Sequence, residues 1–169
     1  RKNALSKFIH NSYKTAIDIG CGTGLDSVSL ALNGLKVTGY DTSKQMISKA
    51  RENAKQRNLK IRFISAPFSK ACVTKSTKAD LVVSLGNAFA NIKEKDLKGI
   101  INIAHEVLNE GGSFLFQVLN YDLIRKENKR IVNITSKNGI TFIRFYDIEK
   151  NLLRFNILTV NETNTSDYS

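Results

Sequence analysis

Three glycines spaced G-x-G-x-G, at Gly20, Gly22 and Gly24, follow a short apolar run. Residues 25–32 then show the apolar spacing of an amphipathic helix, which Gly34 ends. A strand joined to a helix by such a turn is typical of the first unit of a parallel α/β sheet. The turn therefore predicts a ligand-binding crevice at the carboxyl end of the first strand.

The remaining segments extend this pattern into a layered sheet. Helical spacing predicts helices at residues 4–9, 25–32, 46–54 and 97–108. Five segments apolar on both faces predict parallel strands covered by helices on both sides, at residues 16–19, 36–40, 61–64, 81–85 and 113–119. After about residue 130, three apolar segments with short turns predict an antiparallel meander. Because no linker interrupts the chain, we expect residues 1–169 to form a single domain.

The glycine spacing distinguishes two classes of nucleotide site. The dinucleotide fingerprint places a third glycine where this chain has Leu25, because a pyrophosphate must approach the helix N-terminus closely. S-adenosylmethionine has no phosphate, and its cationic groups favour a nearby carboxylate such as Asp18. Asp41, 21 residues after Gly20, stands where an acid accepts the ribose hydroxyls in either class. The spacing, together with the antiparallel C-terminal strands, favours S-adenosylmethionine.

Four segments in order resemble the class I S-adenosylmethionine-dependent methyltransferases. They are AIDIGCGTG (16–24), VTGYDTSKQMISKA (37–50), ADLVVSLGNAFANI (79–92) and VLNEGGSFLFQVLN (107–120). The resemblance covers roughly residues 4–160. It implies a Rossmann-like, seven-stranded, mostly parallel sheet that ends in an antiparallel strand hairpin. It also implies S-adenosylmethionine as cofactor and S-adenosylhomocysteine as product.

The resemblance further implies which residues contact the cofactor. These are Asp18, Gly20, Cys21, Gly22 and Gly24 at the methionine moiety, Asp41, Thr42 and Met46 at the adenosine, Ala66, Pro67 and Phe68 at the adenine, and Leu85, Gly86 and Asn87 near the sulfonium. Many members carry an acid after the third strand for the adenine amino group, whereas this chain reads SAPFSK. Adenine recognition is therefore expected from backbone groups and apolar packing. Structural alternatives stay open: Asp18 can bond to loop amides, Met46 can be a core residue, and Cys21 is better explained as a small filler than as a nucleophile.

The sequence says less about the methyl acceptor than about the cofactor. Methyl transfer depends mainly on aligning the acceptor atom with the methyl group and does not require a dedicated acid or base. No catalytic residue is therefore assigned. The segments SLGNAFANI and FQVLNYDLI resemble the glycine and sarcosine N-methyltransferase branch, which implies that Asn120 and Tyr121 reach the acceptor. Arg144 is a candidate partner for an acceptor carboxylate, or an outward residue on an antiparallel strand. We expect a small-molecule acceptor, an amine or amino-acid nitrogen. An RNA or tRNA methyltransferase and a non-catalytic cofactor-binding module stay open.

The net charge of +11 and the isoelectric point near 9.7 also suit nucleic-acid binding. We do not favour it, because many basic residues alternate with other types along predicted helices, as on solvated faces. No apolar run approaches the roughly 18 residues of a membrane span, and neither Cys21 nor Cys72 has metal-site spacing. We therefore expect a cytoplasmic protein without a metal. Since residue 1 is Arg, we expect the chain to be a fragment.

Overall fold

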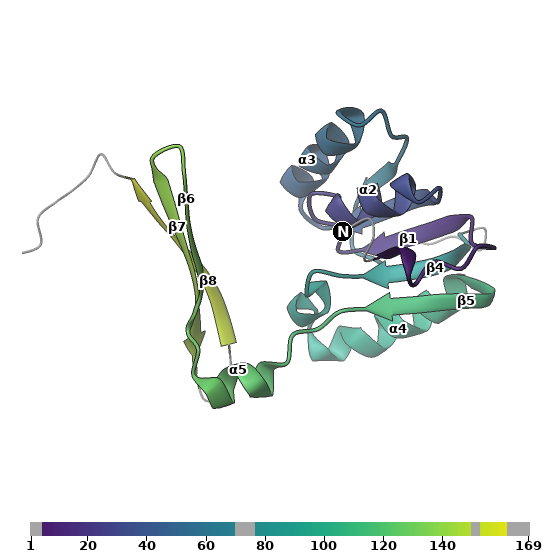
Figure 1. Cartoon of the computed structure of the whole chain (residues 1–169). Helices are drawn as coiled ribbons and strands as arrows, with labels where there is room; N and C mark the ends of the chain where they lie inside the picture. Colours follow the sequence, from purple (N-terminus) through teal and green to yellow (C-terminus); the bar gives the residue numbers. More distant parts are fainter. Residues whose placement is uncertain (1–4, 70–76, 150–152, 162–169) are drawn as a thin grey trace, which may run out of the picture. The chain divides into compact units, whose positions relative to one another are not determined.

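The computed structural model describes residues 5–69, 77–149 and 153–161 (Figure 1). Cys72, expected to be a thiol without a metal, lies outside them. The chain forms two compact units, residues 1–118 and residues 119–169. The strands of the first unit are β1 (Thr15–Ile19), β2 (Lys36–Asp41), β3 (Arg62–Ser65), β4 (Ala79–Ser84) and β5 (Leu108–Phe116). Its helices are α2 (Leu25–Leu32), α3 (Lys44–Lys55), the 3-10 turn η1 (Ala88–Asn91) and α4 (Glu94–Val107).

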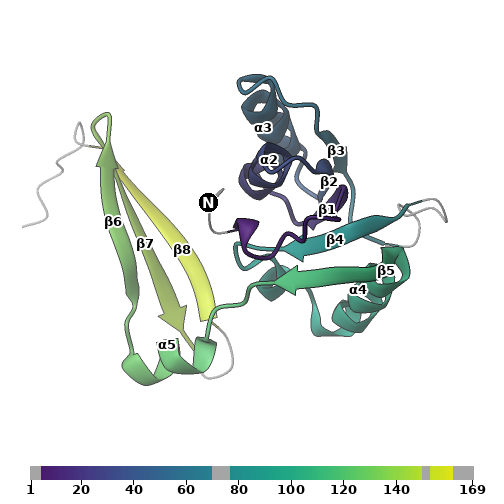
Figure 2. The same cartoon turned by 45° about the vertical axis from the view of Figure 1, so that its right-hand side comes forward.

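The strands of the first unit form one parallel sheet in the order β3-β2-β1-β4-β5. The chain moves outward from β1 to β3 and then returns to the other side of β1 at β4. The carboxyl ends of β1 and β4 therefore diverge into different connections, which opens a crevice at that edge. In Figures 1 and 2, α2 and α3 lie on one face of the sheet and α4 on the other.

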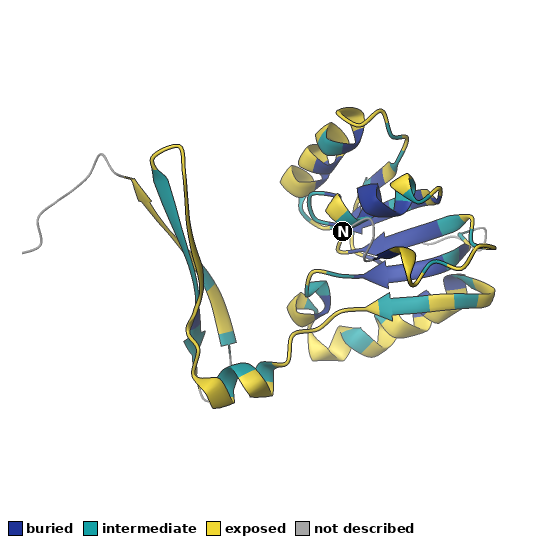
Figure 3. Ribbon diagram, in the orientation of Figure 1, coloured by how far each residue is buried: buried dark blue, intermediate teal, exposed yellow. Residues whose placement is uncertain are grey.

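Alternation along β1 explains the two-sided core. Ile17 and Ile19 pack with the α4 residues Ile103 and Val107, whereas Ala16 packs with Leu30 of α2 on the opposite face. Figure 3 shows the inner strands almost entirely buried. Parallel strands covered on both faces and joined by helices were predicted from the sequence, and this α/β fold class is confirmed.

At the amino-terminal edge of the sheet, one carboxylate of β4 forms hydrogen bonds with both neighbouring strands. Asp80 of β4 accepts hydrogen bonds from the backbone N–H of Lys14 and Thr15, at 2.8 and 2.9 Å, and from the Thr15 hydroxyl at 2.9 Å. Asn109 Nδ2 of β5 donates to it at 2.7 Å. Because these donors favour the ionised form, they lower the pKa of Asp80 to about 2. We refer to this arrangement as the Asp80 clamp.

The second unit contains α5 (Tyr121–Glu127), β6 (Ile131–Lys137), β7 (Ile140–Ile148) and β8 (Leu153–Asn161). The strands form a separate antiparallel sheet in the order β6-β7-β8, so the predicted meander is confirmed. The Asn120 side chain begins α5 by accepting a hydrogen bond from Leu123 N at 2.9 Å. Tyr146 of β7 is buried, with its ring 5.6 Å from that of Phe155.

The expected single sheet of seven strands differs from the two sheets, of five and three strands, in the part of the chain that is described. β7 pairs with β6 on one side and with β8 on the other, so among the described residues these three strands form a sheet of their own.

The start of β5 also lies earlier than predicted. The sequence NEGG indicated a turn before a strand at residue 113, but β5 begins directly after α4, at Leu108. The turn residues fall inside β5, where Gly111 has φ +73° and the register against β4 shifts. They form an irregularity within the strand rather than a connection before it.

Candidate functional site

A pocket of about 980 Å³ opens at the carboxyl edge of the parallel sheet, and the described residues that line it belong to the first unit. Predicted cofactor contacts that line it are Gly20, Cys21, Gly22, Asp41, Thr42, Met46, Ala66, Pro67, Phe68, Leu85 and Gly86. The structure thus brings together four turns that are far apart in the sequence. Parallel strands explain this, because their carboxyl ends all meet at one edge.

The glycine turn leaves space where a ligand could approach the backbone. Gly22 has φ +52°, and a Cβ placed on it would meet no atom within 4 Å. Gly24 is different: a Cβ there would lie 2.9 Å from both Ala50 Cβ and Phe63 Cζ. Gly22 therefore borders open space, while Gly24 permits α2 to pack against α3 and β3.

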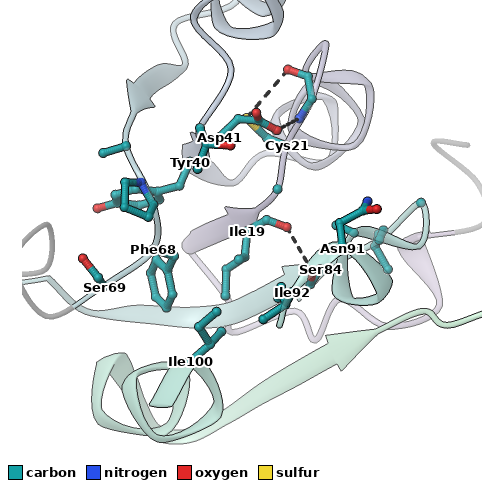
Figure 4. Close-up of a pocket in the computed structure, with 18 of the residues that line it drawn as sticks. Ile19, Cys21, Tyr40, Asp41, Phe68, Ser69, Ser84, Asn91, Ile92 and Ile100 are labelled. Carbon is teal, nitrogen blue, oxygen red and sulfur yellow. Dashed lines mark hydrogen bonds between the residues drawn. The ribbon is translucent and has the colours of Figure 1, made fainter. Parts of the chain in front are cut away.

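Asp41 ends β2 beside the glycine turn. Its Oδ2 accepts a hydrogen bond from Gly22 N at 2.8 Å (Figure 4). Its Oδ1 accepts one from Ser43 N at 2.9 Å. Each carboxylate oxygen has two lone pairs, so both keep acceptor capacity for hydroxyl groups in the pocket. The carboxylate is thus held rigidly with one acceptor position free on each oxygen, a geometry that fits a pair of ribose hydroxyls.

Asp18 lies beneath the turn and does not line the pocket. It is fully buried, and Ser27 Oγ of α2 donates to its Oδ2 at 2.6 Å. Burial raises the pKa of Asp18 to about 7, and the negative charges of Asp26 and Asp41 add to the effect. The structural alternative named loop amides as partners, whereas the described side-chain partner is Ser27 of α2, so Asp18 joins β1 to the first turn of that helix.

Burial likewise raises the pKa of the Cys21 thiol, and Asp18 and Asp41 raise it further. The thiol is therefore neutral at physiological pH, which fits a small filler rather than a nucleophile. Gly24 and Asn87, two other predicted contacts, also do not line the pocket. Gly24 is enclosed by packing, and Asn87 precedes η1 in a left-handed conformation with φ +66°.

The floor of the pocket is apolar and partly aromatic. The rings of Tyr40 and Phe68 meet edge to face at 5.3 Å, and Ile100 and Ile103 of α4 pack in the same cluster (Figure 4). The Ser84 hydroxyl at the end of β4 is buried and donates to Ile19 O at 3.0 Å. Such a floor suits a flat ring, since most of its contact surface is apolar.

The α4 wall of the pocket was missed by the sequence reasoning. Its lining residues are Lys95, Asp96, Gly99, Ile100 and Ile103, with Asn91, Ile92 and Lys93 just before the helix. The apolar stripe of α4 was correctly identified, but it indicated only core packing. The available signal was the start of this helix, which directly follows the turn after the fourth strand.

The loop after β4 is held by the end of β5. Gly86 has φ +62°, and its N–H donates to Gln117 Oε1 at 3.1 Å. Two consecutive residues, Gly86 and Asn87, thus adopt the left-handed region. Gln117 fixes the position of the loop at which the predicted sulfonium contacts Leu85 and Gly86 lie.

The three predicted acceptor residues, Asn120, Tyr121 and Arg144, all belong to the second unit. Arg144 lies along its sheet, where Nη1 donates to Asn133 Oδ1 at 3.1 Å and to Thr135 Oγ1 at 3.0 Å. Asn120 caps α5. Within the described residues, no group of His, Cys, Asp or Glu could hold a metal ion, and no helix has the length and apolar character to cross a membrane.

Residues 16–112, which contain the glycine turn, Asp41 and the α4 wall, match a protein family described as "Methyltransferase domain". The chain belongs to this family. Membership of the methyltransferase domain family confirms the resemblance found in the four sequence segments, and with it the cofactor class, S-adenosylmethionine. The fold agrees: the chain resembles the solved CcbJ methyltransferase from Streptomyces caelestis with a TM-score of 0.77 at 20% identity, covering 96% of this chain and 66% of that one.

Among curated relatives of this methyltransferase domain, a "Glycine/sarcosine N-methyltransferase" of Aphanothece halophytica is 30% identical over 115 residues, which cover 68% of this chain and 43% of the relative. A "Ribosomal protein L11 methyltransferase" of Campylobacter fetus is 32% identical over 104 residues, covering 59% and 36%. The chain spans about two fifths of the length of the curated relatives it matches.

Proposed function

We propose that the protein transfers a methyl group from S-adenosylmethionine to a small-molecule acceptor, an amine or amino-acid nitrogen. The observation that supports this most strongly is the pairing of open space at Gly22 with the rigid Asp41 carboxylate, above an apolar floor. Several relatives are named glycine/sarcosine N-methyltransferases, which favours a nitrogen acceptor. The two units together would then make up one methyltransferase domain, and the cytoplasmic location stays a prediction.

The residues present fit the cofactor. Gly20 and Gly22 would contact the methionine moiety through their backbone, and Asp41 would accept both ribose hydroxyls. Met46, Pro67 and the Phe68 ring would flank the adenine. The remaining contacts would come from Cys21, Thr42, Ala66, Leu85 and Gly86. Asp18, Gly24 and Asn87 would act indirectly, by fixing the turns that carry these groups.

When bound, S-adenosylmethionine supplies a methyl group already activated by a sulfonium. The loop at Leu85 and Gly86 would align the acceptor nitrogen with that methyl group and exclude water, which is where the protein contributes to the rate. The acceptor nitrogen would supply the lone pair for the new N–C bond, the sulfide of S-adenosylhomocysteine would leave with the C–S electron pair, and the nitrogen would lose its proton to solvent. Asn120, Tyr121 and Arg144 are proposed to contact the acceptor, Arg144 through an acceptor carboxylate.

The high net charge of +11 favours one further candidate, methyl transfer to RNA. The two candidates predict different salt dependence. Binding of a nucleic acid releases counterions and weakens steeply as salt rises, whereas binding of an amino acid changes little. A tRNA-binding titration at two salt concentrations distinguishes them.

The proposal is tested by isothermal titration calorimetry and by methyl transfer. We expect S-adenosylhomocysteine to bind and NAD not to bind, and Asp41→Asn to weaken S-adenosylhomocysteine binding. Tritiated S-adenosylmethionine should label glycine, sarcosine or another small amine from a panel that also contains hydroxyl acceptors and tRNA. Binding of NAD alone would refute the cofactor site, cofactor binding without transfer to any acceptor would indicate a non-catalytic module, and labelling of tRNA alone would refute the acceptor class.

A further inference from the structure

The adenine end of the pocket lacks the acid that its sequence family often supplies after the third strand. Ala66, Pro67, Phe68 and Ser69 line the pocket there; the first three have no polar side chain, and Ser69 offers a hydroxyl but no charge. The exocyclic amino group of adenine is a hydrogen-bond donor, so full recognition calls for an acceptor within the pocket. Backbone carbonyls and the Ser69 hydroxyl are neutral acceptors on this side, and a carboxylate on the opposite wall would accept more strongly because it is charged.

The opposite wall is one face of α4. Asp96, Ile100 and Ile103 all line the pocket, at spacings of four and three residues, so they lie in one row along the helix. Ile100 and Ile103 pack in the same cluster as Phe68, and Figure 4 shows Ile100 pointing toward the Phe68 ring. Asp96 stands one helical turn before Ile100, on the side of the carboxyl edge where the pocket opens.

The Asp96 carboxylate is available for a ligand. Its backbone N–H donates to Lys93 O at 2.8 Å, but its side chain has no hydrogen bond or ion pair with any residue that the structure describes. An acid in the first turn of a helix also has a purely structural explanation, since it stabilises the helix dipole. Glu94, in the same first turn, has this explanation equally but does not line the pocket.

We propose that Asp96 accepts a hydrogen bond from the exocyclic amino group of the cofactor's adenine and so selects adenosine at this site. The inference rests on the proposed function, because it takes the pocket to be the cofactor site. A carboxylate only accepts hydrogen bonds, so it matches the amino group of adenine. Hypoxanthine carries a carbonyl oxygen at the same ring position, which the carboxylate repels.

The test compares two ligands that differ at that position, S-adenosylhomocysteine and S-inosylhomocysteine. Their affinities for the wild-type protein, Asp96→Asn and the control Glu94→Gln are measured by calorimetry. We expect the wild type to prefer the adenosine compound. Asparagine can donate to the inosine carbonyl, so Asp96→Asn should narrow that preference roughly tenfold, the effect of one hydrogen bond to a charged group. Glu94→Gln should leave the preference unchanged.

The outcomes separate this inference from the proposed function. If the wild type binds S-adenosylhomocysteine and Asp96→Asn leaves the preference unchanged, Asp96 serves only the helix and the inference is overturned alone. An equal narrowing in Glu94→Gln would also overturn it, because the effect would then come from the charge of the first turn. If the wild type binds neither compound, the proposed function fails and takes this inference with it.

Discussion

Replacing Gly24 or Gly22 by alanine separates the packing role of the glycine turn from its ligand role. Both glycines have positive φ, +76° and +52°, so an alanine at either position costs about 1–2 kcal/mol of backbone strain. At Gly24 the new Cβ would also approach Ala50 Cβ and Phe63 Cζ to 2.9 Å, and both neighbours are buried. Overpacking of this kind adds about 1–3 kcal/mol, so Gly24→Ala should lose about 2–5 kcal/mol of unfolding free energy in total.

Thermal denaturation followed by circular dichroism measures the difference. For a chain of this size, about 1 kcal/mol corresponds to roughly 2–4 °C in melting temperature. Gly24→Ala should therefore melt at roughly 4–20 °C below the wild type, and Gly22→Ala at only roughly 2–8 °C below it. The two variants should rank in the opposite order for S-adenosylhomocysteine binding. Gly22→Ala should weaken binding more than Gly24→Ala, because only the methyl group added at position 22 would enter the pocket. Equal melting temperatures for the two variants would refute the packing argument.

Three further predictions concern single side chains. Hydrogen-bond donors lower the pKa of Asp80 to about 2. The stability that its ionised carboxylate provides is therefore complete above the unfolded pKa near 3.9 and is lost as pH falls through about 2. Measurements of unfolding free energy at decreasing pH should show this loss in the wild type and not in Asp80→Asn. Burial raises the pKa of Asp18 to about 7. The stability linked to its protonated form is therefore complete below about pH 3.9 and is lost as pH rises through about 7. The urea unfolding midpoint should fall between pH 4 and pH 8 in the wild type and change less in Asp18→Asn. Gln117→Leu removes the acceptor for Gly86 N–H, so the methyl-transfer rate should fall several-fold while Gln117→Glu, which keeps an acceptor oxygen, retains most of it.

Each of these predictions has a result that contradicts it. An acid transition that Asp80→Asn leaves unchanged would mean that other carboxylates control unfolding at low pH. A wild-type protein equally stable at pH 5 and pH 8 would contradict the raised pKa of Asp18. A normal rate in Gln117→Leu, with normal folding, would show that the Gly86 loop keeps its position without the Gln117 contact.

The part of the site that could be predicted lies where the local sequence marks the end of a strand. Gly20, Gly22 and Asp41 stand at the ends of the first two strands, and strand ends can be located from apolar runs and glycines. The role of Asp18 was less accessible, because its neighbour Ser27 lies on the helix that follows the turn, and only packing shows that the two side chains meet. The sequence alone left both explanations of Asp18 open.

The α4 wall could not be predicted for a related reason. The stripe through Ile100 and Ile103 indicates a buried helix face, but not the strand ends against which that face packs. Asp96 likewise has the pattern of any acid in a first helical turn. Its place in the pocket depends on the crossover from β4 to α4, a property of the folded sheet and not of the segment itself.

The Asp80 clamp and the pocket lie at opposite ends of β4. β4 runs from Ala79 to Ser84, a length of roughly 20 Å. None of the clamp residues Lys14, Thr15, Asp80 and Asn109 lines the pocket. Engineering of this protein can use that separation. Libraries that vary the residues lining the pocket should leave the Asp80 clamp intact. Stabilising substitutions near the Asp80 clamp should leave ligand selectivity unchanged.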